Sequence, residues 1–247
     1  MQFIKNYIVQ EILTGFRKPA YLAKTKGKSI IIKTPENWEI LAASRMNHPN
    51  VVSLEGTVLE KNTQSEKLAL KYIPGIDIHE YMSTNGPITD ENYYRIALQI
   101  ARGTAHIHQV GFIHNDLKPS NIILTPDAQP VITDLGSCTP IENKTRLTGT
   151  TPGYRSMEQL RRENMPESDT FSIGAVMYFM TYHSSPVFPN TTLNPTRLEE
   201  INRLTRKIPR KCHPEMQTSR LVRNMLAPKA HDRPTLSEVE TFLQHYC

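Results

Sequence analysis

Short apolar runs rich in β-branched and aromatic residues dominate the first seventy or so positions of the chain. Gly, Lys and Asn residues separate these runs, a pattern typical of strands joined by tight turns. We expect one helix among them, because Thr34 is a suitable N-cap, Pro35 suits the first helical position, and apolar residues follow at helical spacing. Those apolar residues are Trp38, Leu41, Ala42 and Met46. The expected strands lie within residues 7–13, 19–24, 28–33, 51–59 and 67–73.

The pattern becomes helical after the break "IPGID" at residues 73–77. The stretch 89–109 begins at a Thr/Asp cap and places Ile96, Ile100 and Ile107 on one side of the expected helix. We therefore predict an α+β fold in which a small β-rich lobe packs on a larger, mainly α-helical lobe, with a ligand-binding cleft between them. The other expected helices lie at 169–182, 196–207, 217–226 and 235–246.

Composition and charge narrow the class of protein. The chain has 247 residues, 38% hydrophobic, and its net charge of +5 is not concentrated in dense Lys/Arg tracts, so we expect no nucleic-acid partner. The apolar run 171–180 is too short to span a bilayer and indicates a buried helix rather than a membrane segment. Three widely separated cysteines, Cys138, Cys212 and Cys247, favour a reducing, cytoplasmic location. Cys138 could be sensitive to oxidation, although an inert side chain is the commoner case.

Two short apolar stretches, "NIIL" and "VIT", flank the turn "TPDAQP" and predict a β-hairpin. Such a hairpin returns Asp134 of "TDLG" close to Asn121 and Asp116. A carboxylate and an amide oxygen are hard ligands that suit Mg²⁺, which takes its other ligands from water and phosphates. Asp116 would then orient a hydroxyl group and accept its proton, while Lys118 would balance charge on a moving phosphoryl group. The pattern therefore predicts phosphoryl transfer.

The octet "HNDLKPSN" (114–121), followed by "DLG", resembles the catalytic and metal loops of eukaryotic-type protein kinases, and the resemblance covers nearly the whole chain. It implies one kinase domain over residues 1–247, with an N-lobe to about residue 73, a hinge at about 71–77 and a C-lobe from about residue 78. It also implies ATP as the phosphate donor, Mg²⁺ (or Mn²⁺) as the metal, and proteins as acceptors. The lysine in "DLKPSN" and Thr151 before "PGY" are similar to the serine/threonine branch, so Thr151 is added to the candidate catalytic residues.

The resemblance also assigns residues of the nucleotide site and its supports. Lys33, at the end of "SIIIK", would hold the α- and β-phosphates and pair with Glu39 of the following helix. Gly15 would belong to the glycine-rich loop. In "HDRP", Arg233 would pair with Glu158 at the end of the activation segment. The hinge "LALKYIPGID" would contact adenine through Lys71, Tyr72 and Ile73 and the ribose through Asp77.

The chain departs from the kinase pattern at three places. Asn115 stands where the family commonly has an arginine, and the loss of that cation predicts activity without phosphorylation of the activation segment; alternatively, Asn115 only fills space. The glycine-rich loop has Leu13 and Lys18 at two glycine positions, which predicts weak ATP affinity. Only six positions separate Lys33 from Glu39, so Lys33 could instead pair with Glu36.

Two other classes of protein share parts of this pattern. A pseudokinase would keep the fold as a nucleotide-binding interaction module without transferring phosphate. A small-molecule kinase of the aminoglycoside or choline type would share the Asp–Asn–Asp arrangement but not the activation segment that ends in "SME". The compact lobes would also fit an effector delivered to a host cytosol. The substrate and the oligomeric state are left open by the sequence.

Overall fold

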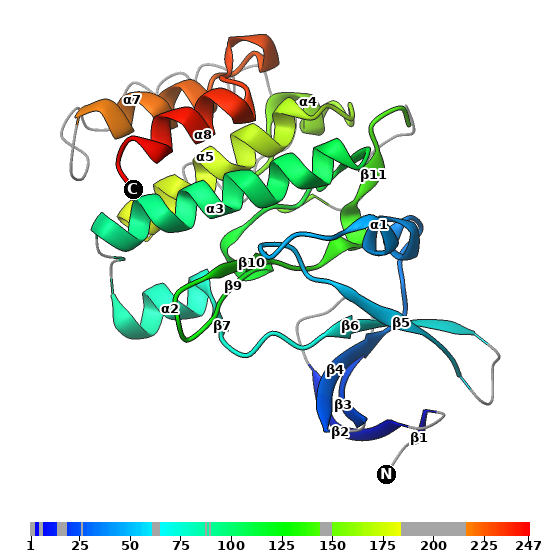
Figure 1. Ribbon diagram of the computed structural model, residues 1–247. Coiled ribbons are helices and arrows are strands. Elements are labelled where there is room, and N and C mark those ends of the chain that lie inside the picture. Colours follow the sequence, from blue (N-terminus) through cyan, green and yellow to red (C-terminus); the bar gives the residue numbers. More distant parts are fainter. Residues whose placement is uncertain are drawn as a thin grey trace.

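The computed structural model describes residues 3–4, 7–13, 19–25, 27–60, 65–86, 88, 90–143, 150–183 and 216–247. An antiparallel sheet forms one end of the molecule and a group of helices the other (Figure 1). The predicted bilobal α+β fold is therefore confirmed. Within the described ranges the sheet has six strands in the order β1-β2-β3-β4-β6-β5. They are β1 (Phe3–Ile4), β2 (Tyr7–Leu13), β3 (Ala20–Thr25), β4 (Lys28–Lys33), β5 (Leu54–Leu59) and β6 (Glu66–Lys71).

The end of β4 lies inside this sheet, with a partner strand on either side. Lys33 is paired with Ala20 of β3 and with Leu68 of β6. Successive side chains of a strand point to opposite faces, and Ile31 and Lys33, two positions apart, both face the cleft below the sheet. The strand pairing therefore fixes the backbone from which the Lys33 side chain extends.

The first helix begins later than its sequence pattern predicts. Helix α1 spans Glu39–Arg45, so the expected cap at Thr34 and start at Pro35 are wrong. The hydroxyl of Thr34 accepts a hydrogen bond from Lys67 Nζ at 2.8 Å, and Trp38 occupies the N-cap position without a side-chain cap. The expected apolar positions divide: Ala42 and Met46 are buried, but Trp38 and Leu41 are 39% and 40% exposed.

Long helices form the C-lobe (Figure 1). In α3 the three predicted isoleucines are fully buried, and α5 is buried along most of its length, as expected. The helix expected at 196–207 lies outside the described residues. No helix in the described ranges is both long and apolar enough to cross a membrane. The helices are α2 (Ile78–Asn85), α3 (Asp90–Gln109), α4 (Met157–Leu160), α5 (Glu167–Tyr182), α7 (Met216–Met225) and α8 (Leu236–Gln244), with 3-10 turns at Pro119–Asn121, Leu135–Ser137 and Ala230–Asp232.

The predicted β-hairpin is present and sets the floor of the cleft. Strands β9 (Ile122–Leu124) and β10 (Pro130–Ile132) pair in antiparallel fashion, and β7 (Ile76–Asp77) pairs with β9. Just beyond the hairpin, the backbone N–H of Thr133 donates to the carbonyl of Asn121 at 2.8 Å. Residues 121 and 134 are therefore brought together as expected. A further pair joins β8 (Phe112–Ile113) to β11 (Thr139–Pro140).

Candidate active site

A cavity of about 450 Å³ lies between the N-lobe sheet and the hairpin. This volume lies within the usual range for small-molecule and cofactor sites. Part of the cavity wall is apolar and consists of Ile31, Val52, Leu70 and Ile123. The sequence analysis did not identify these four residues. The cavity also brings together nine of the predicted site residues: Lys33, Lys71, Tyr72, Ile73, Asp77, Asp116, Lys118, Asn121 and Asp134. Gly15 lies outside the described residues, as do Lys18 and the side chain of Leu13.

A buried lysine joins the two lobes at the back of this cavity. Lys33 Nζ lies 2.8 Å from Glu39 Oε1 and 2.8 Å from Asp134 Oδ1. Glu39 is the first residue of α1 and is fully buried. Its second oxygen accepts a hydrogen bond from the backbone N–H of Glu36 at 3.1 Å. The structure therefore pairs Lys33 with Glu39 rather than with Glu36.

The opposite charges of Lys33, Glu39 and Asp134 stabilise one another. Burial alone would lower the pKa of Lys33, but the carboxylates of Asp134 and Glu39 raise it above its usual value. Burial likewise opposes ionisation of Asp134, yet Lys33 lowers the pKa of this carboxyl below its usual range. The lysine is therefore a cation and Asp134 an anion near neutral pH. A fixed cation facing the cavity suits the phosphates of a nucleotide.

The carboxylate of Asp116 is held on two sides. Its Oδ1 accepts a hydrogen bond from the backbone N–H of Thr151 at 2.8 Å, and its Oδ2 lies 3.1 Å from Lys118 Nζ. Lys118 Nζ also donates to Thr151 Oγ1 at 2.9 Å. Three of the four candidate catalytic residues therefore form one cluster, and the fourth, Asn121, lies beside it with Nδ2 3.4 Å from Asp116 Oδ2. The carboxylate is oriented by an amide and a cation, so it is suited to orient a hydroxyl group.

Asn121 has the atoms expected of a metal ligand. Its Nδ2 donates to the backbone carbonyl of Asp116 at 2.8 Å. This bond uses the amide nitrogen, so Oδ1 is the atom of the side chain that can face a metal. Asp134, in the left-handed backbone region at φ 54°, supplies a carboxylate to the same cavity. These hard oxygens fit Mg²⁺ or Mn²⁺, which would complete its coordination with water and phosphate oxygens. Asn121 and Asp134 would hold it.

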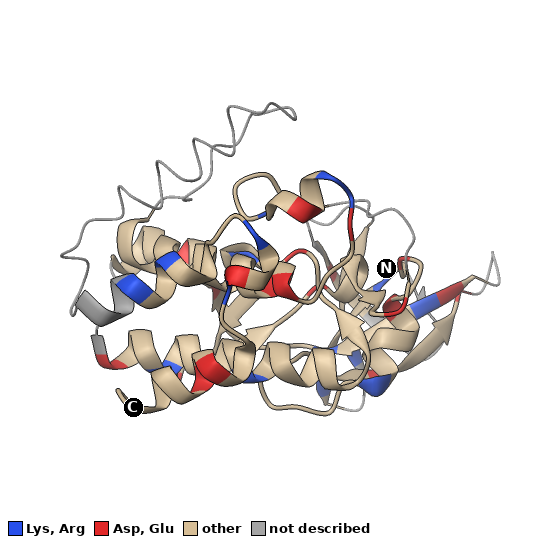
Figure 2. Cartoon of the chain, turned by 90° about the horizontal axis from the view of Figure 1, so that it is seen from above, with Lys and Arg blue, Asp and Glu red and all other residues tan. Residues whose placement is uncertain are grey.

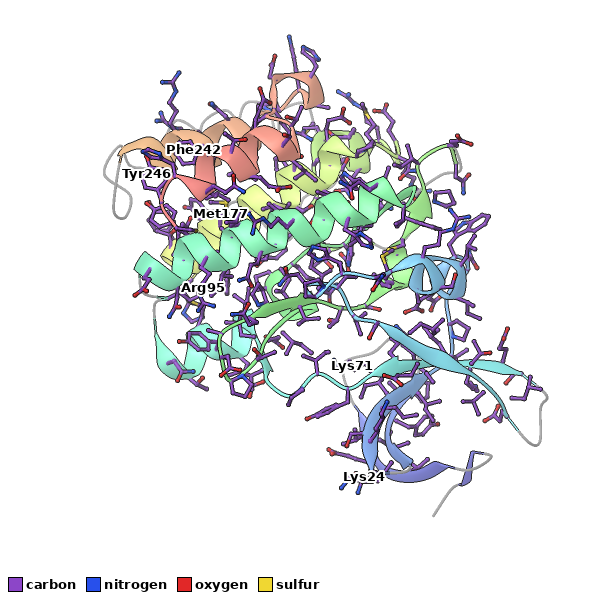
Figure 3. The ribbon with its side chains drawn as sticks, in the orientation of Figure 1. Lys24, Lys71, Arg95, Met177, Phe242 and Tyr246 are labelled. Carbon is purple, nitrogen blue, oxygen red and sulfur yellow. The ribbon has the colours of Figure 1, made fainter. Side chains whose placement is uncertain are left out.

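The segment that connects the lobes borders the same cavity. Lys71 lies where the chain leaves β6 toward the helical lobe (Figure 3). Asp77, expected at the ribose, also caps α2, because its Oδ1 accepts from the N–H of Glu80 at 2.8 Å. Glu80 itself lines the cavity and was missed, as was α2. The Asp-x-x-Glu spacing is a helix-start signal and could have located both. Gly75 of the segment packs tightly on the hairpin, and a Cβ there would lie 2.1 Å from the Leu124 carbonyl oxygen.

A fully buried carboxylate supports the catalytic loop from below. Asp169, near the start of α5, accepts hydrogen bonds from the backbone N–H groups of His114 and Asn115 at 2.8 and 2.9 Å, and its Oδ2 lies 2.8 Å from His108 Nε2. Burial opposes ionisation, but the His108 contact and these donors lower the pKa of Asp169. The sequence analysis did not identify this residue, because its partners are more than fifty positions away in the sequence and leave no local pattern.

Asn115 does more than fill space. It adopts φ 67°, a left-handed conformation that Asn tolerates better than most residues. Its Nδ2 donates to Thr139 Oγ1 at 2.9 Å and to the Ser137 carbonyl at 3.1 Å, and its own carbonyl accepts from Gln159 Nε2 at 2.9 Å. Thr139 in turn donates to Asn164 Oδ1 at 2.7 Å. The catalytic loop, residues 137–139 and the α4 region are thus joined by neutral amides and a hydroxyl.

Two further expectations concern the supports of the site. Arg233 forms a two-pronged ion pair with Glu158, as predicted, with Nη2 2.9 Å from Oε2. Burial opposes ionisation of Glu158, but Arg233 lowers its pKa below the usual range. Cys138 is buried, and burial together with Asp169 and Glu39 raises the pKa of its thiol well above the usual value. The unreactive form of Cys138 is therefore favoured over a redox-sensitive one.

Comparison with known proteins agrees with this architecture. A protein kinase domain matches residues 21–246. The chain is 30% identical over 203 residues to serine/threonine-protein kinase ppk6 of Schizosaccharomyces pombe and 30% identical over 222 residues to serine/threonine-protein kinase pkn3 of Myxococcus xanthus. Each alignment covers 81% of this chain but only 24% and 39% of the relative. Serine/threonine-protein kinase PrkC of Bacillus subtilis is 30% identical over 146 residues, which is 57% of this chain and 22% of PrkC.

The chain therefore belongs to the protein kinase family, as the sequence motifs indicated. It spans well under half the length of these three relatives. The names of all three agree with the serine/threonine branch expected from "DLKPSN" and Thr151.

Proposed function

We propose that the chain is an active serine/threonine protein kinase that transfers the γ-phosphoryl group of ATP to protein hydroxyl groups. The observation that carries the proposal is the convergence of Lys33, Asp116, Lys118, Asn121 and Asp134 on one cavity. Phosphoryl transfer depends mainly on positioning and electrostatic stabilisation, so a few fixed charges are enough. Membership of the protein kinase family supports the same reaction and implies protein substrates.

Each residue of the cluster has a role that its contacts support. Lys33, held by Glu39, binds the α- and β-phosphates. Asp116 orients the accepting hydroxyl and takes its proton, since its carboxylate is fixed by Thr151 N–H. Lys118 balances negative charge on the transferred group. Mg²⁺ or Mn²⁺, held by Asn121 and Asp134, would neutralise charge on the phosphates.

We further propose that catalysis does not require phosphorylation of the activation segment. The amide network of Asn115, Thr139, Gln159 and Asn164 supports this, because it joins the segment after Asp134 to the catalytic loop without any net charge. In kinases that have an arginine at this position, a phosphate on the activation segment makes the same connection through charge-assisted hydrogen bonds. With a neutral amide at residue 115, there is no cation there for a phosphate to offset.

We also propose that the enzyme is located in the cytoplasm, in keeping with its separated cysteines.

The test is transfer of labelled γ-phosphate to a generic protein by bacterially produced chain. We expect incorporation on serine and threonine that depends on Mg²⁺, is abolished by EDTA, and falls at least about a hundredfold in Asp116→Asn, the scale of general base catalysis. Phosphatase pretreatment of the enzyme should leave the rate unchanged. Nucleotide binding without transfer would instead identify a pseudokinase, and loss of activity after phosphatase would defeat the phosphorylation-independent mechanism alone.

A further inference from the structure

Two histidines meet where the chain leaves α1 and passes the helical lobe. The imidazole of His48, in the segment after α1, stacks on that of His106, near the end of α3, with ring centroids 5.3 Å apart and an angle of 23° between the rings. Both side chains are partly buried. Figure 1 shows the end of α1 beside the last turns of α3, and a hydrogen bond between Asn47 and His106 joins the two segments. The histidine pair therefore lies at a junction between the two lobes.

The hydrogen bonds of the histidine pair require neutral imidazoles. The backbone N–H of Asn47 donates to His106 Nε2 at 3.0 Å, and the backbone N–H of Asn50 donates to His48 Nδ1 at 3.2 Å. A backbone N–H can only donate, so each of these ring nitrogens must carry a lone pair. In a protonated imidazole both nitrogens carry hydrogens, and the acceptor is lost. Each proton that the pair takes up therefore removes one hydrogen bond from the junction.

The charged groups around the histidine pair disfavour protonation. Burial, together with His106 and Arg102 of α3, lowers the pKa of His48. Arg102 Nε lies 3.7 Å from Glu240 of α8, so the nearest described carboxylate is paired with the arginine. Arg45, at the end of α1, donates to the backbone carbonyl directly after α3. No carboxylate in the described part of the chain forms an ion pair with either imidazole of the pair.

His108, two positions further along α3, provides a comparison. Its Nε2 lies 2.8 Å from Oδ2 of the fully buried Asp169, which is the partner that a charged imidazole needs. The histidine pair faces two backbone donors and an arginine instead. Charged side chains of both signs are interspersed over the molecule in the view of Figure 2. Local partners, rather than a broad field of one sign, therefore determine the protonation of the pair.

We propose that the histidine pair is a pH-sensitive contact that fixes the segment after α1 to the C-lobe at neutral pH and loosens it in mild acid. Its effect on the rate rests on the kinase activity proposed above, whereas its effect on the structure does not. The short connection between β4 and α1 keeps α1 with the sheet, so loosening this contact frees the N-lobe to move on the C-lobe. Such movement separates Lys33 of the N-lobe from Asp134 of the C-lobe, which lie 2.8 Å apart in the closed arrangement.

The pH range of the change follows from His48. An exposed histidine has a pKa of about 6.5, and the docked imidazole has a lower one. The released segment therefore binds the proton first. The docked arrangement is fully stable above about pH 6.5 and loses stability as the pH falls through the lower, docked-state pKa. Asn50 Nδ2 still donates to Gln99 and to the Pro130 carbonyl, and these bonds do not titrate, so the segment loosens without unfolding.

The first test follows the wild-type chain by NMR between about pH 5.5 and 7.5, the range in which histidine titrates. We expect the imidazole signals of His48 to titrate with a midpoint below about pH 6.5. Hydrogen-exchange protection of the Asn47 and Asn50 amides, corrected for the intrinsic rate, should fall about tenfold over the same range, the factor that one pKa unit represents. Protection that stays constant while His48 titrates overturns the proposal.

A double variant that cannot titrate provides the second test. His48→Asn places an amide oxygen near the position of Nδ1, and His106→Gln places one near Nε2, so both acceptors are kept without a titrating group. The double variant should retain amide protection in acid. Its kcat/KM should fall about tenfold less than that of the wild type between about pH 7.5 and 5.5. His245→Gln, which alters an exposed histidine after α8, should keep the wild-type response.

The outcomes separate this proposal from the proposed function. Amide protection that falls equally in the wild type and in the double variant overturns the role of the histidine pair and leaves the kinase intact. Equal acid dependence of kcat/KM in the two proteins overturns the control of the rate. A loss of protection that only the wild type shows, in a chain that transfers no phosphate at any pH, supports the pH-sensitive contact and overturns the kinase activity.

Discussion

Lys33 and Glu39 are six positions apart, yet they lie on different elements and their side chains form a buried ion pair with 2.8 Å between Nζ and Oε1. The short connection places Glu39 in the first turn of α1, directly opposite the end of β4. Because the link is so short, α1 has little freedom to move away from the sheet. The short connection itself therefore holds the two side chains in contact.

Removal of Glu39 should be costly to both stability and rate. Glu39→Ala leaves Lys33 buried with Asp134 as its remaining carboxylate, and breaking a buried pair costs about 3–5 kcal/mol of unfolding free energy. We expect a large fall in kcat as the phosphate-binding cation loses its position. Urea unfolding and steady-state kinetics measure the two effects. An equal or larger loss in Glu36→Ala would contradict the assignment of the pair.

Gly75 should be intolerant of any side chain. A Cβ there would lie 2.1 Å from the Leu124 carbonyl oxygen, and its φ of +148° is one that other residues rarely adopt. Gly75→Ala must push the hinge away from β9, so we expect a loss of about 1–3 kcal/mol from overpacking and a higher KM for ATP. Gly86→Ala is the matched control, since Gly86 has φ +78° but no atom within 4 Å of its Cβ position. Unchanged ATP affinity in Gly75→Ala would be inconsistent with this packing.

The hydroxyl of Thr139 connects Asn115 to Asn164 and should affect the rate. Thr139→Val keeps the shape but removes one acceptor and one donor, each worth about 1 kcal/mol. We expect kcat to fall several-fold, because residues 137–139 lose their attachment to the catalytic loop. Thr139→Ser retains the hydroxyl and should restore most of the rate. If Val and Ser variants behave alike, the network does not position the loop.

The Glu158–Arg233 ion pair should make the free energy of unfolding fall as the solution becomes acidic. The pKa of Glu158 is lower in the folded chain than in the unfolded chain, so the pair stabilises the fold above the usual glutamate pKa. That contribution is lost as the pH falls through the folded-state pKa. Glu158→Gln should therefore be about 3–5 kcal/mol less stable at pH 7, with a difference that narrows below about pH 4.

Urea unfolding midpoints, measured at intervals of about one pH unit between pH 3 and 7, give this difference in stability. Glu163→Gln changes an exposed carboxylate nearby and should leave the profile unchanged. A Glu158→Gln difference that stays constant over the whole range would show that the pair is not the source.

Local pattern was sufficient to predict strands β2 to β6 and the hairpin that brings Asn121 and Asp134 together. Lys33, Glu39 and the residues that connect the lobes were instead assigned by resemblance to the kinase family. The predicted start of α1 was wrong because Thr34 and Pro35 carry a strong local signal, whereas Thr34 follows β4 and bonds to Lys67 of β6, 33 positions away. Asp169, Gln159 and Asn164 were missed for a similar reason. Their partners in the catalytic loop and beyond are fixed by tertiary packing, which no periodicity reveals.

The amide at residue 115 also has a consequence for the solution conditions in which the loop stays ordered. Attraction between a phosphate and an arginine weakens as ions accumulate around it, with a screening distance of about 8 Å at physiological ionic strength. Hydrogen bonds among Asn115, Thr139 and Asn164 carry no net charge and escape that screening. The link between the catalytic loop and residues 137–139 should therefore persist in concentrated potassium chloride, where a link made of opposite charges would loosen.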